Sequence, residues 1–208
     1  MKKKIILFIL ITILISSCYK KKEKTFICKG NKETEAGSAN REDNSVTLGE
    51  REVNSSTFVC LGSGYSKDKN SVYLLNYKIK GADPKTFEYV VGVYSKDKNK
   101  IFYADKEIKK ADFETFEIIN VSYSKDKSHV YYEEEVIKEA DAGTFKLVNK
   151  SDFYFKDKNY VYFGGKVLPD SDVRTFIVHD ELQVKKGIYY KAEDKNNYYE
   201  YGKAVLEK

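Results

Sequence analysis

The stretch YSKDKNKIF at residues 94–102 decides the fold, because the chain repeats it. Close copies stand at residues 65–73, 123–131 and 154–162, and a looser copy, DKNNYY, stands at residues 194–199. The aspartates of successive copies are 29, 29, 31 and 37 residues apart. A fixed period of this length is the signature of tandem repeats that stack on their neighbours.

A second signature, Asp-x-x-Thr-Phe, keeps the same spacing. Counting back 29 residues from its first copy lands on one more Thr-Phe pair, at Thr57. We therefore expect five units, the last one truncated, whose first residues are the core phenylalanines Phe58, Phe87, Phe116, Phe145 and Phe176.

The sequence of one unit predicts three strands and a turn. Residues 87–96 are rich in Tyr and Val, which favours a strand, and Gly92 predicts a bulge or kink within it. A second strand is expected at Ile101–Tyr103 and a third at residues 106–109. Equivalents of the second strand are expected at Val72–Leu74, Val130–Tyr132 and Val161–Phe163.

The repeated aspartates have a local reason to form turns, since Asp side chains hydrogen-bond backbone N–H groups two residues on. These turn residues are Asp68, Asp97, Asp126, Asp157 and Asp194. Calcium binding is the competing interpretation. Each turn offers one carboxylate flanked by lysines, whereas Ca²⁺ takes six to eight oxygen ligands. The pattern therefore favours turns, and we expect no metal site.

The signature beginning at Asp112 predicts a short helical turn, because Asp is a good N-cap, and Phe116 then enters the core. A unit of about 29 residues buries too little surface to fold alone. The expected fold is therefore all-β: tandem three-stranded antiparallel meanders, each with a short helical turn, sharing one core.

These two signatures resemble the DKNYY repeat family of bacterial surface and exported proteins. The resemblance covers about residues 54–208, and it implies no catalytic residues. Two departures stand out: Ser128 replaces the usual Asn of the third copy, and the fifth copy lacks a following Asp-x-x-Thr-Phe.

The N-terminus has the pattern of a bacterial lipoprotein signal. Three lysines precede an apolar run, Ile5 to Ile15, that is too short to span a bilayer as a helix. The run ends in Ile-Ser-Ser-Cys, which predicts a signal peptide at residues 1–17 and lipidation of Cys18. An ordinary secretory signal followed by a chance cysteine is the alternative.

Residues 18–53 are expected to form a tether. Its basic run at residues 19–24 predicts either contact with anionic headgroups or a solvated spacer. Export implies an oxidising compartment, where a disulfide between Cys28 and Cys60 would tie the tether to the folded body. Two free thiols are the alternative.

Composition excludes several classes of function. The 37 basic residues nearly balance the 32 acidic ones, which argues against a nucleic-acid partner. His129 and His179, the only two histidines, stand outside any catalytic motif. No phosphate-binding loop or hydrolase signature is present, so we expect neither an enzyme nor a cofactor.

The aromatic residues are the remaining surface candidates. One row, with Phe102 and Tyr131, alternates with a second row of Tyr103, Tyr132 and Phe163. Neighbouring strand residues face opposite sides, so one row should face the core and the other should face solvent unless a second layer covers it.

The sequence predicts a non-catalytic lipoprotein anchored to a membrane of the cell envelope, with a repeat array that binds an envelope protein or a glycan. The alternative is a carbohydrate- or peptidoglycan-binding module that uses the outward aromatic row. Cross-strand pairing that merely stabilises the sheet is the simpler interpretation of these aromatics.

Overall fold

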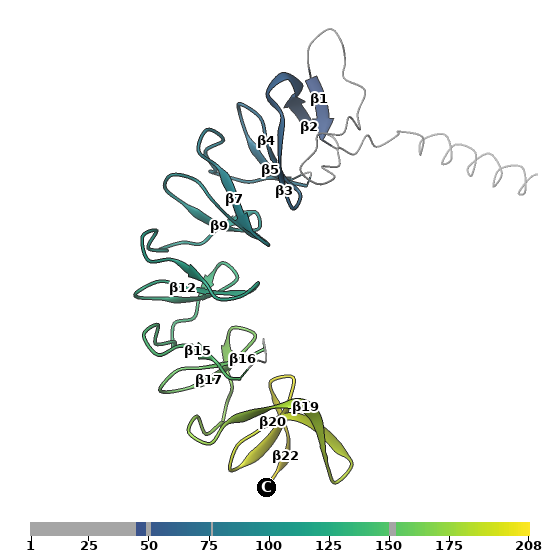
Figure 1. The fold of residues 1–208 in the computed structure, drawn as a ribbon, viewed down its shortest axis with the longest axis vertical. Coiled ribbons are helices and arrows are strands. Elements are labelled where there is room, and N and C mark those ends of the chain that lie inside the picture. The colour runs from purple at the N-terminus through teal and green to yellow at the C-terminus, as the bar shows by residue number, and fades with distance from the viewer. Residues whose placement is uncertain (1–44, 49–50, 76, 150–152) are drawn as a thin grey trace, which may run out of the picture. The chain divides into compact units, whose positions relative to one another are not determined.

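The computed structural model describes residues 45–48, 51–75, 77–149 and 153–208. The chain divides into two compact units, residues 1–78 and residues 79–208. Both units are built from antiparallel β-sheet, which confirms the expected fold class (Figure 1).

The described residues of the first unit form a strand pair, a short 3₁₀ turn and one four-stranded sheet. The pair is β1 (Ser45–Leu48) and β2 (Arg51–Asn54), and the turn is η1 (Ser55–Thr57). The sheet consists of β3 (Val59–Gly62), β4 (Tyr65–Lys67), β5 (Val72–Leu74) and β6 (Tyr77–Lys78). The strand pair lies largely within the expected tether; its two strands of four residues are too short for a recognisable alternation.

The second unit contains four sheets, one for each later repeat. The first is β7 (Glu88–Val91), β8 (Tyr94–Lys96), β9 (Ile101–Tyr103) and β10 (Lys106–Glu107). The second is β11 (Glu117–Ile118), β12 (Tyr123–Lys125), β13 (Val130–Tyr132) and β14 (Glu135–Val136). The third is β15 (Lys146–Leu147), β16 (Tyr154–Lys156), β17 (Val161–Phe163) and β18 (Lys166–Val167). The fourth is β19 (Ile177–Lys185), β20 (Ile188–Glu193), β21 (Asn197–Glu200) and β22 (Lys203–Glu207).

Each repeat has four strands rather than the expected three. The stretch at residues 87–96 is not one kinked strand, because the chain reverses at Gly92 and β7 pairs back onto β8. A glycine with φ of +58° closes this hairpin, since only the left-handed region allows so tight a turn. The expected second strands, by contrast, match β5, β9, β13 and β17 residue for residue.

The helical turn of each signature is a single hydrogen-bonded turn. The N–H group of Thr115 donates to the carbonyl oxygen of Asp112 at 3.3 Å, and the turns at Asp83, Asp141 and Asp172 repeat this bond. The last repeat was expected to be truncated, but β19–β22 form a complete sheet with the longest strands.

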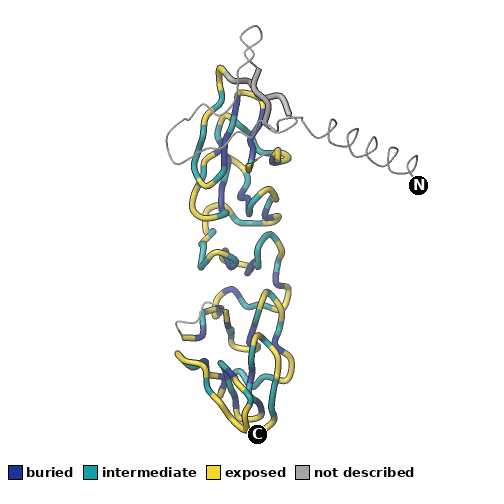
Figure 2. Tube along the Cα trace, turned by 90° about the vertical axis from the view of Figure 1, so that its right-hand side faces the viewer, coloured by how far each residue is buried: buried dark blue, intermediate teal, exposed yellow. Residues whose placement is uncertain are grey.

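Successive sheets of the second unit share their cores. The aromatic ring of Tyr131 packs with Tyr94 and Ile101 of the preceding sheet, while Val130 beside it packs with Phe155 of the following sheet. Neighbouring residues on one strand are therefore both fully buried, because both faces of the sheet are covered (Figure 2). This confirms the shared core within residues 79–208.

Candidate interaction surface

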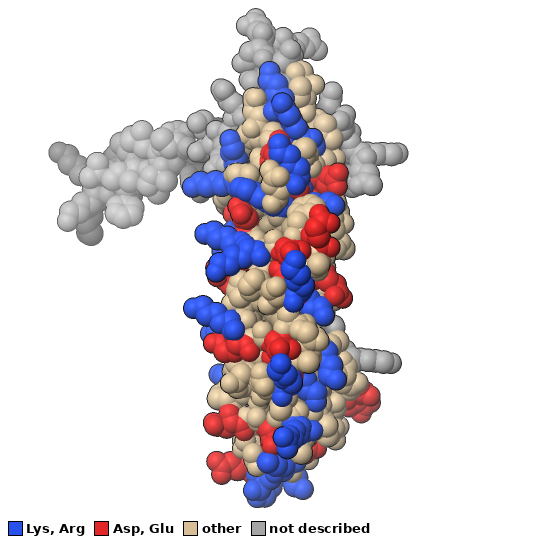
Figure 3. Space-filling view, turned by 90° about the vertical axis from the view of Figure 1, so that its left-hand side faces the viewer, with Lys and Arg blue, Asp and Glu red and all other residues tan. Residues whose placement is uncertain are grey.

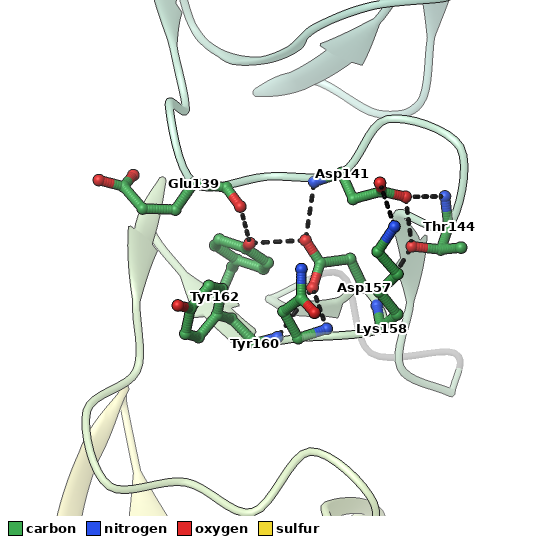
Figure 4. Close-up of polar contacts among 8 residues, drawn as sticks. Glu139, Asp141, Thr144, Asp157, Lys158, Tyr160 and Tyr162 are labelled. Atoms are coloured by element: carbon green, nitrogen blue, oxygen red, sulfur yellow. Dashed lines mark hydrogen bonds and ion pairs between the residues drawn. The ribbon is translucent and has the colours of Figure 1, made fainter.

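The repeated aspartate joins two segments of the chain, as Asp157 illustrates (Figure 4). Its Oδ1 atom accepts hydrogen bonds from the N–H groups of Asn159 and Tyr160, at 2.7 and 2.8 Å, which closes the expected turn. Its Oδ2 atom accepts from the N–H group of Asp141 at 2.8 Å and from the hydroxyl of Tyr162 at 2.7 Å. The side chain therefore ties the turn to the signature that precedes it by 16 residues.

This arrangement, which we call the aspartate clamp, recurs along the chain. The local turn bonds form at all five sites: Asp68, Asp97, Asp126, Asp157 and Asp194. The bond to the preceding signature forms at Asp97, Asp126 and Asp194 as well, at 2.6–2.9 Å.

The signature aspartate is held in turn by the lysine that follows the clamp. Asp141 accepts hydrogen bonds from the N–H and hydroxyl groups of Thr144 and pairs with the ammonium of Lys158 at 2.8 Å. Four such ion pairs, of 2.7–3.3 Å, occur in the second unit: Lys98–Asp83, Lys127–Asp112, Lys158–Asp141 and Lys195–Asp172.

The clamp fixes the protonation state of its members. Burial alone would favour neutral Asp126, but hydrogen bonds from the Asp112 N–H, the Tyr131 hydroxyl and the two turn N–H groups outweigh it and lower the pKa of Asp126 to about 2. Burial and the hydrogen bond to Asp126 raise the pKa of Tyr131 far above its usual value. Neither group titrates near neutral pH, where a general acid or base would need to.

On the face that Figure 3 shows, basic and acidic side chains are interspersed along the molecule. Over the part of the chain that the structure describes, no three His, Cys, Asp or Glu side chains come together as a metal-binding group would. Within the same residues, no helix is long and apolar enough to cross a membrane.

The signature phenylalanines differ in depth, and Phe116, which was expected to be buried between neighbouring units, is not fully buried. Phe87, Phe145 and Phe176 are buried, whereas Phe58 and Phe116 are half-buried. The ring of Phe145 stacks on Phe155 with 5.2 Å between centroids. Phe116 contacts the rings of Tyr94 and Tyr131 at 6.3 and 6.0 Å between centroids, and a groove opens beside it.

The aromatic row expected to face solvent is half-covered. Tyr132 packs against the ring of Tyr123 in its own sheet, and the next hairpin passes over it at Gly165. A β-carbon at Gly165 would lie 2.5 Å from the Tyr132 ring, so only glycine allows this approach. Phe163 lies under Gly202 in the same way. A continuous outward aromatic surface is therefore not formed by this row.

Some exposed apolar side chains lie at the first hairpins of the second unit, while others, such as Leu75 and Tyr201, lie at later hairpins. Val91, Val121 and Phe153 occupy these tips in the first three sheets of the second unit and are 51%, 64% and 62% exposed. In the fourth sheet the same hairpin is longer and exposes Leu182, Val184 and Tyr189. We call these six residues the apolar tips.

The cysteines fall partly outside the described residues. Cys60 lies in β3 and is disulfide-bonded. Cys28 and Cys18 lie outside the described residues, so the pairing of Cys28 with Cys60 and the lipidation of Cys18 stay predictions.

Sequence reasoning missed the hydroxyl of the repeat tyrosines. Tyr131, Tyr162 and Tyr199 donate to the clamp aspartate five residues before them, at 2.7–2.8 Å. The signal was the constant Asp-to-Tyr spacing. An apolar core position alone would not need a hydroxyl, and Phe102 is the one departure among the five repeats.

No curated protein and no solved structure gives a significant match to the chain. The DKNYY family matches at residues 3–106, 40–164 and 137–203. These overlapping ranges follow the repeats described above and together extend from residue 3 to residue 203. The chain therefore belongs to the DKNYY family and is a repeat protein.

Proposed function

We propose that the protein is a non-catalytic envelope protein, lipid-anchored through Cys18, whose β-repeat array serves as an interaction surface. One observation carries this proposal. The polar side chains of the repeated motifs bond to one another in the aspartate clamps, whereas the apolar tips remain exposed at the first hairpin of successive repeats.

The clamps argue against catalysis by the repeated residues. Asp157 uses both carboxylate oxygens on four donors, and it is 4% exposed. A carboxylate so saturated has no lone pair directed at a substrate. The tips, by contrast, expose apolar side chains that a partner would cover.

The interaction surface is tested by photo-crosslinking in intact cells. A photoreactive amino acid at Val121 or at Phe153 should capture a discrete partner. The same residue at the exposed Lys109 is the matched control and should capture none. Equal labelling from all three positions, or none from the tips, would contradict the proposal.

The anchor is tested separately by Cys18→Ala. We expect this variant to leave the membrane fraction, because acyl chains contribute most of the binding energy of a lipid anchor. A variant that stays with the membrane would remove the anchor from the proposal. Retention of the full chain on purified cell wall would favour a glycan as the partner.

A further inference from the structure

The strand β19 is an unusually long edge strand. It lies at the end of its sheet and has nine residues, whereas its counterparts β7, β11 and β15 have four, two and two. Short edge strands protect a sheet from pairing with other chains, and a long one with exposed apolar side chains invites it.

The hairpin geometry fixes which backbone groups of β19 face the open edge. Lys186 and Gly187 form its two-residue turn, with φ of +50° and +77°, so Lys185 and Ile188 form the hydrogen-bonded pair that closes the hairpin. The pairing alternates along the regular end of the ladder, from Gln183 to Lys185, which leaves the N–H and C=O groups of Val184 and the C=O group of Leu182 directed toward the open edge.

The sequence along this edge is complementary to itself. If two copies of β19 run antiparallel about Gln183, Leu182 of one copy lies opposite Val184 of the other, and both side chains are about half exposed in one copy. In the same register Glu181 lies opposite Lys185. The pairing therefore supplies apolar contact, two ion pairs and backbone hydrogen bonds at once.

We propose that β19 is the surface through which two copies of this chain associate, antiparallel and centred on Gln183. A symmetric contact of this kind is closed, because the same patch is used on both copies. Its extent is bounded on the N-terminal side. There Asn149 donates to the carbonyl of Val178 and to the carboxylate of Asp180. The ladder to β20 is irregular between Val178 and Gln183, so Glu181 and Leu182 belong to the proposed pairing but not to the regular ladder.

The register is tested with single cysteines in the full chain. In the proposed pairing Gln183 lies opposite its own copy at a non-hydrogen-bonded site. The Cα atoms there are about 4.5 Å apart, within the range of a disulfide. Gln183→Cys should therefore give a disulfide-linked dimer under mild oxidation in the producing cells.

Lys185→Cys is the matched control on the same strand. Its two copies would be about 13 Å apart, too far for a disulfide. We expect at least about tenfold less dimer from it than from Gln183→Cys. Equal crosslinking at both positions, no crosslinking at Gln183, or a mixed disulfide with a different protein would overturn the proposal.

The charges are tested by reversal and rescue. Glu181→Lys or Lys185→Glu alone places like charges opposite each other twice in the symmetric pair. Each should weaken dimerisation by about tenfold when the purified full chain is sedimented in detergent. The double exchange should restore it. Failure of the double exchange to rescue, or a monomer in every variant and in the parent, would overturn the proposal. This inference does not depend on the lipid anchor.

Discussion

The carboxylate of the repeated aspartate closes a local turn and also bonds to the preceding signature, and the sequence predicted only the turn. The turn bonds of Asp126 reach N–H groups two and three residues ahead, which local spacing predicts. Its bond to the N–H group of Asp112, 14 residues back, arises only when the hairpin between them folds. The ion pair of Lys127 with Asp112 could not be predicted for the same reason.

Asp126→Asn should destabilise the protein by about 2–4 kcal/mol, because the amide replaces an acceptor of two hydrogen bonds with a donor and removes the charge. Asp105→Asn is the control: Asp105 is exposed, and its loss should cost under about 0.5 kcal/mol. Urea unfolding of both variants gives the comparison. Similar midpoints would mean that the clamp contributes little.

Acid should weaken the protein through the clamps. The pKa of Asp126 in the fold, about 2, lies below the roughly 3.9 of an unfolded aspartate. Its contribution is therefore complete above about pH 4 and is lost as the pH falls toward 2, by about 2–3 kcal/mol. The pKa values of Asp157 and Asp194 are lowered in the same direction.

Free energies of unfolding measured between pH 7 and pH 2 test this expectation. The decline should be shallower in Asp126→Asn, which has no carboxylate to protonate at that site. A parent whose stability is flat down to pH 2 would contradict the assigned direction.

At the scale of the element, the sequence predicted the repeated strands β5, β9, β13 and β17, but it did not predict the first hairpin of each repeat. The strand at Val130–Tyr132 carries an apolar pair buried on both faces, and this pattern gave its bounds. The first hairpin varies in length and composition between repeats, so its reversal at Gly92 resembled a bulge within one strand.

The second copy of the strand offers a natural substitution experiment. Phe102 lacks the hydroxyl that Tyr131 donates to Asp126 at 2.7 Å. Phe102→Tyr should supply a new bond to Asp97 and stabilise the protein by about 1 kcal/mol. Tyr131→Phe should destabilise it by at least that amount. Thermal melts of both variants test whether a tyrosine five residues after the clamp aspartate forms this hydrogen bond. A destabilised Phe102→Tyr would show that the second repeat has no space for the hydroxyl.

At the scale of the whole molecule, stability depends on side chains that belong to two repeats at once. Phe145 contacts Tyr123 of one sheet and both Phe155 and Tyr162 of the next, with centroids 5.2–5.8 Å apart. The sequence predicted this role for all five phenylalanines equally. It could not predict that Phe116 would be half-buried, because the depth of each ring depends on how the neighbouring sheets pack around it.

Phe145→Ala should cost about 3–5 kcal/mol, the usual loss for a large buried ring. Phe153→Ala removes the same atoms from an apolar tip that is 62% exposed and should cost under about 1 kcal/mol. Urea melts measure both. Equal losses would place the shared core elsewhere.

The aspartate clamp closes the base of the first hairpin in the four repeats of the second unit, and these hairpins are not of equal size. The clamped residues are 14 apart at Asp97 and Asp126, 16 apart at Asp157 and 22 apart at Asp194. The last hairpin is eight residues longer than the shortest ones and still forms the closing hydrogen bond. The clamp is therefore constant between these repeats, whereas the hairpin loop varies in length. New loops can therefore be inserted into the first hairpin of a repeat, between its two clamped residues, without changing the rest of the repeat.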